Sequence, residues 1–175
     1  MTNHFKIKPA ITSVAGYFQN TIKKTLFCFG LPVLVLCSEP VLAQSNVAQC
    51  FAMASNQFDI PLELLIAVKH VESGSRLDTG IIHTNTNGTS DLGIMQINST
   101  WLPRLAEFGV TAEDLLTDHC VNIAVGAWIL ADAIAKTASY AEALSMYNTG
   151  RAWSIAGKRY THRVEQVLTR MLASN

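Results

Sequence analysis

One carboxyl group stands out in this 175-residue sequence because its neighbours predict that it holds a proton near neutral pH. Glu72 lies four residues after Val68 and seven after Leu65, so it shares the buried face of a predicted helix and sits at the end of that face. Gly74 ends the helix just beyond it, at the negative end of the helix dipole. Burial and the dipole both raise the pKa, the direction that a general acid needs. These neighbours alone are equally consistent with a surface glutamate that has no catalytic role, near the end of a solvated helix.

Helical patterns account for most of the chain that must position this glutamate. Apolar residues recur at helical spacing and predict helices over residues 47–58, 62–73, 98–108, 118–136, 140–147 and 161–172, with a short turn after residue 111. Between Gly80 and Asn98 the composition changes to Thr, Asn, Ser, Gly and Ile, and Asn87-Gly88 is a turn signal between two weak strand patterns. We expect a mainly α fold, formally α+β, with one small antiparallel β-hairpin.

Four motifs occur in a characteristic order along the predicted helices and turns. They are Glu72-Ser73 at a helix end, residues 93–98 (GIMQIN), Asn122 with Gly126, and residues 146–150 (MYNTG). In order and spacing they resemble the soluble lytic transglycosylases (SLT) of the lysozyme-like superfamily, over nearly the whole chain after residue 43. The likeness is greatest to the small, exported, cysteine-bridged members that accompany bacterial secretion, conjugation and pilus systems. The resemblance implies a lysozyme-like fold and an enzyme that cleaves peptidoglycan.

Carried over to this sequence, the resemblance makes Glu72 the only acid and base of the reaction. The carboxyl would protonate the oxygen of the β-1,4 bond between N-acetylmuramic acid and N-acetylglucosamine. It would then take the proton of the muramic C6 hydroxyl as that oxygen attacks the anomeric carbon, closing a 1,6-anhydro ring without water. No cofactor and no metal are expected.

The resemblance also assigns substrate-binding roles around Glu72. Ser73 and Gln96 are expected to contact the glycan, and Met95 is expected to line the wall of the cleft. Tyr147 is expected to hydrogen-bond near the catalytic carboxyl. Asn148 is expected to fix the adjoining loop.

Asp91 and Tyr160 each allow two interpretations. Residues 89–94 also resemble the hairpin of animal-type lysozymes, where an aspartate serves as a second carboxylate, and retaining glycosidases need two carboxyl groups about 5 Å apart. Asp91 facing Glu72 would then permit hydrolysis. The alternative, which we favour, is that Asp91 organises the neighbouring turn by accepting backbone hydrogen bonds. Tyr160 resembles a tyrosine that often follows the Tyr-Asn motif, and fits equally well as a core aromatic at the start of the last helix.

The first 43 residues have the composition of a secretory signal peptide. Lys23 and Lys24 precede an apolar run, residues 26–36, that is too short to span a bilayer as a helix. Short side chains at the end of the segment predict cleavage after Ala43, although an uncleaved anchor has a similar composition. We expect residues 44–175 to form one lysozyme-like domain in the periplasm, or beyond it, with no stable membrane anchor.

The cysteines predict one disulfide in the exported domain. Removal of the signal segment takes away Cys28 and Cys37 and leaves Cys50 and Cys120. An even count in an exported chain favours a disulfide, and two buried thiols are the alternative. Closing this loop would stabilise the fold by roughly 4 kcal/mol in the loop-entropy model.

The charge of the chain argues against a nucleic-acid partner. The sequence carries 13 basic and 13 acidic residues, and loss of the first 43 leaves 9 basic and 12 acidic, with no basic stripe. The histidines are too scattered to indicate a metal site. The expected partners are therefore peptidoglycan glycan strands and components of a secretion, conjugation or pilus apparatus.

Three functional hypotheses remain open at this stage. The first is a lytic transglycosylase that opens the cell wall locally for an envelope-spanning machine. The second keeps the fold and makes the protein a lysozyme-type hydrolase that uses Glu72 and Asp91. The third is a glycan-binding assembly factor without catalytic activity.

Overall fold

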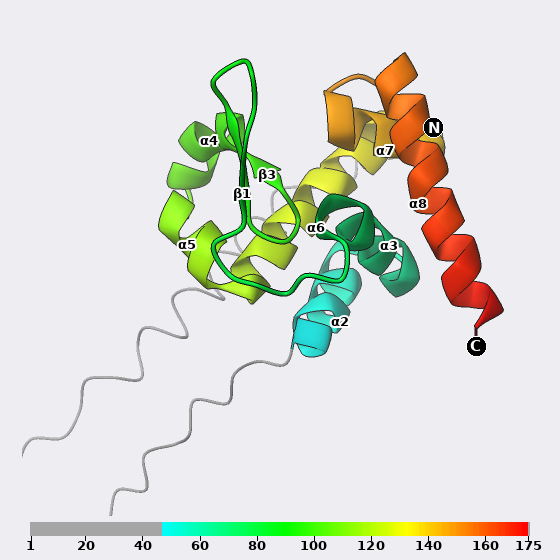
Figure 1. Ribbon diagram of the computed structural model, residues 1–175, viewed down its shortest axis with the longest axis horizontal. Helices are drawn as coiled ribbons and strands as arrows, with labels where there is room; N and C mark the ends of the chain where they lie inside the picture. Colours follow the sequence, from blue (N-terminus) through cyan, green and yellow to red (C-terminus); the bar gives the residue numbers. More distant parts are fainter. Residues whose placement is uncertain (1–46, 175) are drawn as a thin grey trace, which may run out of the picture.

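The computed structural model describes residues 47–174, so the predicted signal segment and its cleavage site lie outside the described residues. Helices dominate this part of the chain, with one small antiparallel sheet (Figure 1). The elements are α2 (Val47–Phe58), α3 (Leu62–Ser73), β1 (Ile82–Thr84), β2 (Ser90–Leu92), β3 (Ile97–Asn98), the 3-10 helix η1 (Ser99–Trp101), α4 (Leu102–Ala106), α5 (Ala112–Thr117), α6 (His119–Lys136), α7 (Tyr140–Thr149) and α8 (Ile155–Ala173). The mainly α, lysozyme-like architecture predicted from the sequence is confirmed.

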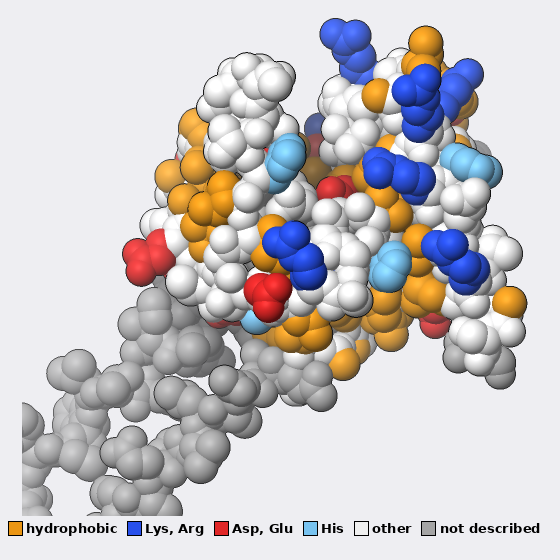
Figure 2. Space-filling model, in the orientation of Figure 1, with side chains coloured by type: hydrophobic (Ala, Val, Ile, Leu, Met, Phe, Trp, Pro, Cys, Tyr) orange, Lys and Arg blue, Asp and Glu red, His pale blue; other side chains and the backbone are white. Residues whose placement is uncertain are grey.

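A hollow separates two lobes of the molecule. The sheet lies with α4 and α5 on one side, α7 and α8 lie on the other, and α6 runs between them (Figure 1). The space-filling view shows that side chains leave the space between the hairpin lobe and the α7–α8 lobe open (Figure 2). Acidic side-chain atoms lie at the floor of this hollow, and Lys and Arg atoms lie along its α8 side.

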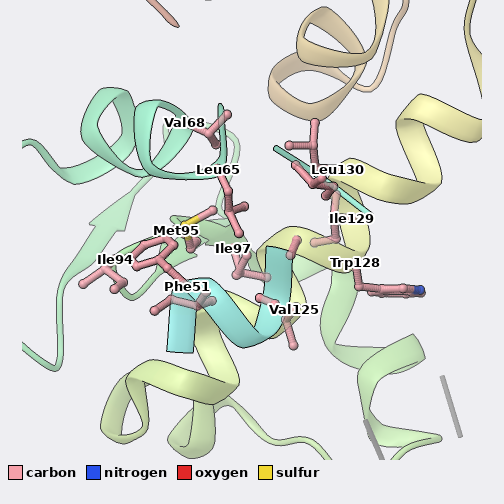
Figure 3. Close-up of a cluster of buried hydrophobic side chains, with 14 of the residues drawn as sticks. Phe51, Leu65, Val68, Ile94, Met95, Ile97, Val125, Trp128, Ile129 and Leu130 are labelled. Atoms are coloured by element: carbon pink, nitrogen blue, oxygen red, sulfur yellow. The ribbon is translucent and has the colours of Figure 1, made fainter. Parts of the chain in front are cut away.

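The long helix α6 forms the centre of the core. It begins where the Asp118 carboxylate accepts hydrogen bonds from the backbone N–H groups of Cys120 and Val121. Side chains from α2, α3, the sheet and α6 converge in one cluster, as Figure 3 shows for Phe51, Leu65, Met95, Ile97 and Val125. Among the described helices, α6 alone has the length and composition of a membrane span, and 67% of it is buried inside the protein. It is the core helix of this fold.

The predicted disulfide between Cys50 and Cys120 is present. It joins α2 to the first turn of α6, with a Cα–Cα distance of 4.9 Å, and both residues are buried. The bond ties helices that are 70 residues apart in the sequence and that already pack against each other. It therefore holds the N-terminal helix of the described domain on the core.

The sheet contains one strand more than the predicted hairpin. Its order is β1-β2-β3, all antiparallel, and Asp91 in the middle strand pairs with His83 on one side and Asn98 on the other. The third strand forms because the chain reverses after Leu92, where Gly93 and Gln96 both have positive φ. This tight turn brings the buried Ile97 back alongside β2.

The last helix begins earlier than the sequence pattern predicted. Helix α8 starts at Ile155, not Thr161, because the hydroxyl of Ser154 accepts a hydrogen bond from the backbone N–H of Gly157 at 2.8 Å and caps the helix. The early start puts Tyr160 inside the helix, on its buried face, with 1% of its surface exposed.

Candidate active site

Glu72 lies in the last turn of α3, as the sequence predicted. The helix ends at Gly74, whose N–H donates to the carbonyl of His70 at 2.9 Å. Lys69, one turn before the helix end, is almost fully buried and donates from Nζ to the carbonyl of Gly74 at 2.9 Å. This bond ties the segment that follows Glu72 back onto α3, so the position of the carboxyl is set by its own helix.

The direct partner of the Glu72 carboxyl comes from the other end of the chain. The hydroxyl of Tyr160, on α8, donates a hydrogen bond of 2.5 Å to Oε1 of Glu72. The two residues are 88 positions apart, and the packing of α3 against α8 brings them together. Sequence reasoning left Tyr160 open between a core role and a site role. The structure gives it both, since the ring is buried and the hydroxyl contacts the carboxylate.

Burial raises the pKa of Glu72 from its ordinary 4.5 to about 7. The negative charge of Asp91 acts in the same direction. The hydrogen bond from Tyr160 and the positive charge of Arg163 oppose the rise, because both stabilise the carboxylate. Burial dominates, so near neutral pH a large fraction of the protein carries a proton on Glu72.

Tyr147 lies beside Tyr160, and its hydroxyl bonds to the turn between β2 and β3. The two rings stack with centroids 6.3 Å apart, and the Tyr147 hydroxyl donates to the backbone carbonyl of Met95 at 3.0 Å. The expected hydrogen bond near Glu72 is therefore made to the turn beside the site, while Tyr160 contacts the carboxyl itself. Burial raises the pKa of both tyrosines well above 10, so both hydroxyls remain proton donors.

A single buried amide holds the turn between β2 and β3 in place. Oδ1 of Asn122, on α6, accepts from the N–H of Met95 at 2.8 Å, while its Nδ2 donates to the carbonyls of Leu92 and Leu115. The backbone of Gly93 passes so close that an added Cβ would lie 2.2 Å from Asn122 Nδ2. Glycine is required there for space as well as for its positive φ. Asn122 and Gly93 thus serve to pack this turn against α6.

The residues predicted to contact the glycan, Ser73 and Gln96, and the residue predicted to fix the adjoining loop, Asn148, differ in whether their side chains reach the surface. Gln96 is partly exposed and donates to the carbonyl of Gly93 at 2.7 Å, and Asn148 is exposed at the end of α7. Ser73 is 8% exposed and its hydroxyl is 3.4 Å from the carbonyl of Lys69, on its own helix. Each of these residues lies on an element that borders Glu72 or the turn.

The expectation that the Met95 side chain lines the cleft is wrong. The side chain is fully buried because it packs against α6 at Gly126, where an added Cβ would lie 2.9 Å from it. Met95 therefore supports the wall from behind. Its backbone, which is buried as well, binds Asn122 and Tyr147.

Both oxygens of Asp91 are held by amide side chains of its own lobe. Nδ2 of Asn85 donates to Oδ2 at 2.9 Å, and Nδ2 of Asn98 donates to Oδ1 at 2.7 Å. Asp91 thus organises the sheet, through side-chain amides where backbone N–H donors were expected. Its charge is still close enough to raise the pKa of Glu72.

A partly buried, protonatable carboxyl that accepts a hydrogen bond from a tyrosine can give a proton to a leaving oxygen and take one back. The chain matches the family model of the transglycosylase SLT domain over residues 49–167. This protein belongs to the SLT transglycosylase family, as its motifs predicted, and is a lytic transglycosylase.

Several curated relatives match the same part of the chain. Invasion protein IagB of Salmonella typhimurium (strain SL1344) is 39% identical over 120 residues, which is 67% of this chain and 73% of the relative. Protein IpgF of Shigella flexneri is 33% identical over 117 residues, 67% of this chain and 74% of the relative. X polypeptide of Escherichia coli is 35% identical over 118 residues, 67% of this chain and 69% of the relative.

Proposed function

We propose that this enzyme cleaves the β-1,4 bond between N-acetylmuramic acid and N-acetylglucosamine and leaves 1,6-anhydromuramic ends, with Glu72 as the only acid and base. One observation carries the proposal: burial holds the pKa of Glu72 at about 7. A carboxyl with this pKa is present in both the protonated and the ionised form near neutral pH, and each form serves one step of the reaction.

In the first step, neutral Glu72 gives its proton to the glycosidic oxygen as the bond to the anomeric carbon breaks. The carboxylate left behind is stabilised by the Tyr160 hydroxyl, because a hydrogen bond to an ionised oxygen is stronger than one to a neutral oxygen. In the second step, this carboxylate takes the proton of the muramic C6 hydroxyl while its oxygen bonds to the anomeric carbon. Glu72 regains its proton and no water is consumed.

Hydrolysis with Asp91 as the second carboxylate receives less support. A nucleophilic or charge-stabilising aspartate must present an oxygen to the anomeric carbon. Both oxygens of Asp91 already accept hydrogen bonds from Asn85 and Asn98. We propose that Asp91 positions the hairpin, and that Gln96 and Asn148, whose side chains reach the surface, contact the glycan with Ser73 and Tyr147 shaping the site around Glu72.

The enzyme acts outside the cytoplasm, because its family acts on peptidoglycan. We propose that residues 1–43 are a cleaved signal peptide and that residues 44–175 work in the periplasm. We further propose that the enzyme opens the wall for a secretion, conjugation or pilus apparatus. The 39% identity to a protein named for invasion supports a role tied to such a machine.

Digestion of purified sacculi tests the reaction. Mass spectrometry should find muropeptides with anhydro ends, lighter by one water than the products of hydrolysis. Glu72→Gln should abolish cleavage while the protein still sediments with sacculi and unfolds cooperatively. Reducing ends as the main product, or cleavage that survives Glu72→Gln, would refute the proposed mechanism. Intact glycan with the wild-type protein would favour a role in assembly alone.

A further inference from the structure

Positive charge gathers at one end of the described chain. Of the nine Lys and Arg residues after residue 46, five follow residue 150, and that segment contains one acidic residue, Glu165. The net charge of the whole domain hides this cluster, because the remainder of the domain is acidic. The segment comprises α8 and the loop before it, and Figure 2 shows Lys and Arg side chains on this lobe beside the hollow.

One of these five residues is placed at the candidate active site. Arg163 is one helical turn after Tyr160 on α8, is exposed, and has its guanidinium carbon 5.6 Å from the centroid of the Tyr160 ring. Tyr160 in turn donates to Glu72. The guanidinium therefore covers the tyrosine that holds the catalytic carboxyl, at the edge of the site.

The guanidinium of Arg163 is not engaged by a carboxylate within the described residues. The two ion pairs found among them, Arg76 with Asp78 and Lys136 with Asp132, lie in other parts of the fold. A planar guanidinium that rests on an aromatic ring and keeps its N–H groups for solvent is suited to bind a carboxylate through two parallel hydrogen bonds.

We propose that Arg163 is a specificity-determining residue that binds a carboxylate of the peptide stem on the muramic acid next to the scissile bond. The inference rests on the proposed function, since it requires the scissile bond of the glycan to lie at Glu72. In peptidoglycan the stem branches from the same sugar whose bond is cleaved, and its carboxylates are the main negative charges of the strand. When the scissile bond lies at Glu72, the stem carboxylates of the muramic acid therefore lie within reach of Arg163.

Binding of the stem at Arg163 also acts on the proton of Glu72. The positive charge of Arg163 lowers the pKa of Glu72, in the same direction as the hydrogen bond from Tyr160 and against Asp91. A bound carboxylate offsets that positive charge, so the pKa of Glu72 rises and the acid holds its proton to higher pH. Neither Tyr160 nor Tyr147 changes this balance, because burial keeps both protonated. A substrate with a peptide stem thus increases the fraction of enzyme in which Glu72 is protonated.

The test compares glycan strands that carry peptide stems with strands whose stems an amidase has removed. Wild-type kcat/KM should be higher on the stem-bearing strands by about fivefold, the upper end for an exposed ion pair. Arg163→Gln should bring the two substrates close to parity, and Arg163→Lys should keep part of the preference. Arg170→Gln, two turns further along α8, is the matched control and should behave as wild type.

The pH dependence of kcat gives a second readout that a purely structural role would not move. For the wild type, the basic limb should lie at higher pH on stem-bearing than on stripped strands, whereas for Arg163→Gln the two limbs should coincide. An unchanged preference in Arg163→Gln, or an equal loss in Arg170→Gln, would overturn the proposal. Anhydro ends from stripped strands would show that the proposed function stands even where the preference fails.

Discussion

Replacing Glu72 with Gln should stabilise the protein above neutral pH and change little in acid. The folded protein holds this carboxyl at a pKa of about 7, against 4.5 for an exposed glutamate. Below the lower value, both the folded and the unfolded chain carry the proton, and burial of the neutral group has no ionic cost. As the pH rises between the two values, the unfolded chain ionises first, so the free energy of unfolding falls. Above the higher value the loss is complete.

The two pKa values set the size of this effect. Their difference corresponds to about 3 kcal/mol, at about 1.36 kcal/mol for each pH unit. Gln is neutral at every pH and retains an oxygen that can accept the hydrogen bond of Tyr160. We therefore expect Glu72→Gln to raise the free energy of unfolding by about 3 kcal/mol near pH 8, and by less than about 1 kcal/mol near pH 4.

Urea unfolding at the two pH values measures this difference, with the disulfide kept oxidised and tryptophan fluorescence as the signal. Glu63→Gln is the matched control, because Glu63 is exposed in the first turn of the same helix. A negative charge is favourable there, so this variant should lose a few tenths of a kcal/mol near pH 8. Equal effects of Glu72→Gln at the two pH values would refute the reasoning, since they would show that burial does not hold the proton on Glu72.

Two further substitutions test the surroundings of the carboxyl, and reduction of the disulfide tests the stability of the fold. Tyr160→Phe removes the hydroxyl that donates to Glu72, which destabilises the carboxylate by about 1.5–3 kcal/mol. The basic limb of the pH–rate profile should therefore move up by roughly 1 to 2 pH units. An unmoved limb would contradict this role of Tyr160. Asp91→Asn should slow cleavage yet leave anhydro ends as the product, whereas loss of all cleavage would favour hydrolysis by two carboxylates. Reducing the bond between Cys50 and Cys120 should lower the free energy of unfolding by about 2–4 kcal/mol, measured by urea titration with and without reductant.

The helices that the sequence predicted well are those with an apolar stripe of clear helical spacing. Helices α2 and α3 have the predicted bounds, and α6, predicted over residues 118–136, spans His119–Lys136. Gly74 stands at the end of α3 and Asp118 caps α6, each next to an apolar stripe of helical spacing. The same signals placed Glu72 in the last turn of α3, and the motif resemblance singled it out as the candidate acid.

No local sequence pattern marks the first turn of α8, because this turn is explained by a tertiary contact. Ile155 is exposed, so no apolar stripe marks the turn, and Gly157 weakens any helical pattern. The structure shows why glycine stands there: an added Cβ would lie 1.9 Å from Oγ of Ser145 on α7. With the helix start misplaced, the sequence could not show that Tyr160 points from a helix toward α3. Its partner, 88 residues away, gives no local sign of the contact.

The balance of forces on Glu72 favours one carboxyl doing two tasks. Enzymes that use two carboxyl groups separate their pKa values, so that one remains an acid while the other remains a base. Here burial raises the pKa of Glu72, while Tyr160 and Arg163 limit the rise, and the result is about 7. A group at that value gives and accepts a proton with similar ease near neutral pH. The residues that set this pKa come from α3, the sheet and α8, so the acid–base property of Glu72 depends on how these three elements pack together.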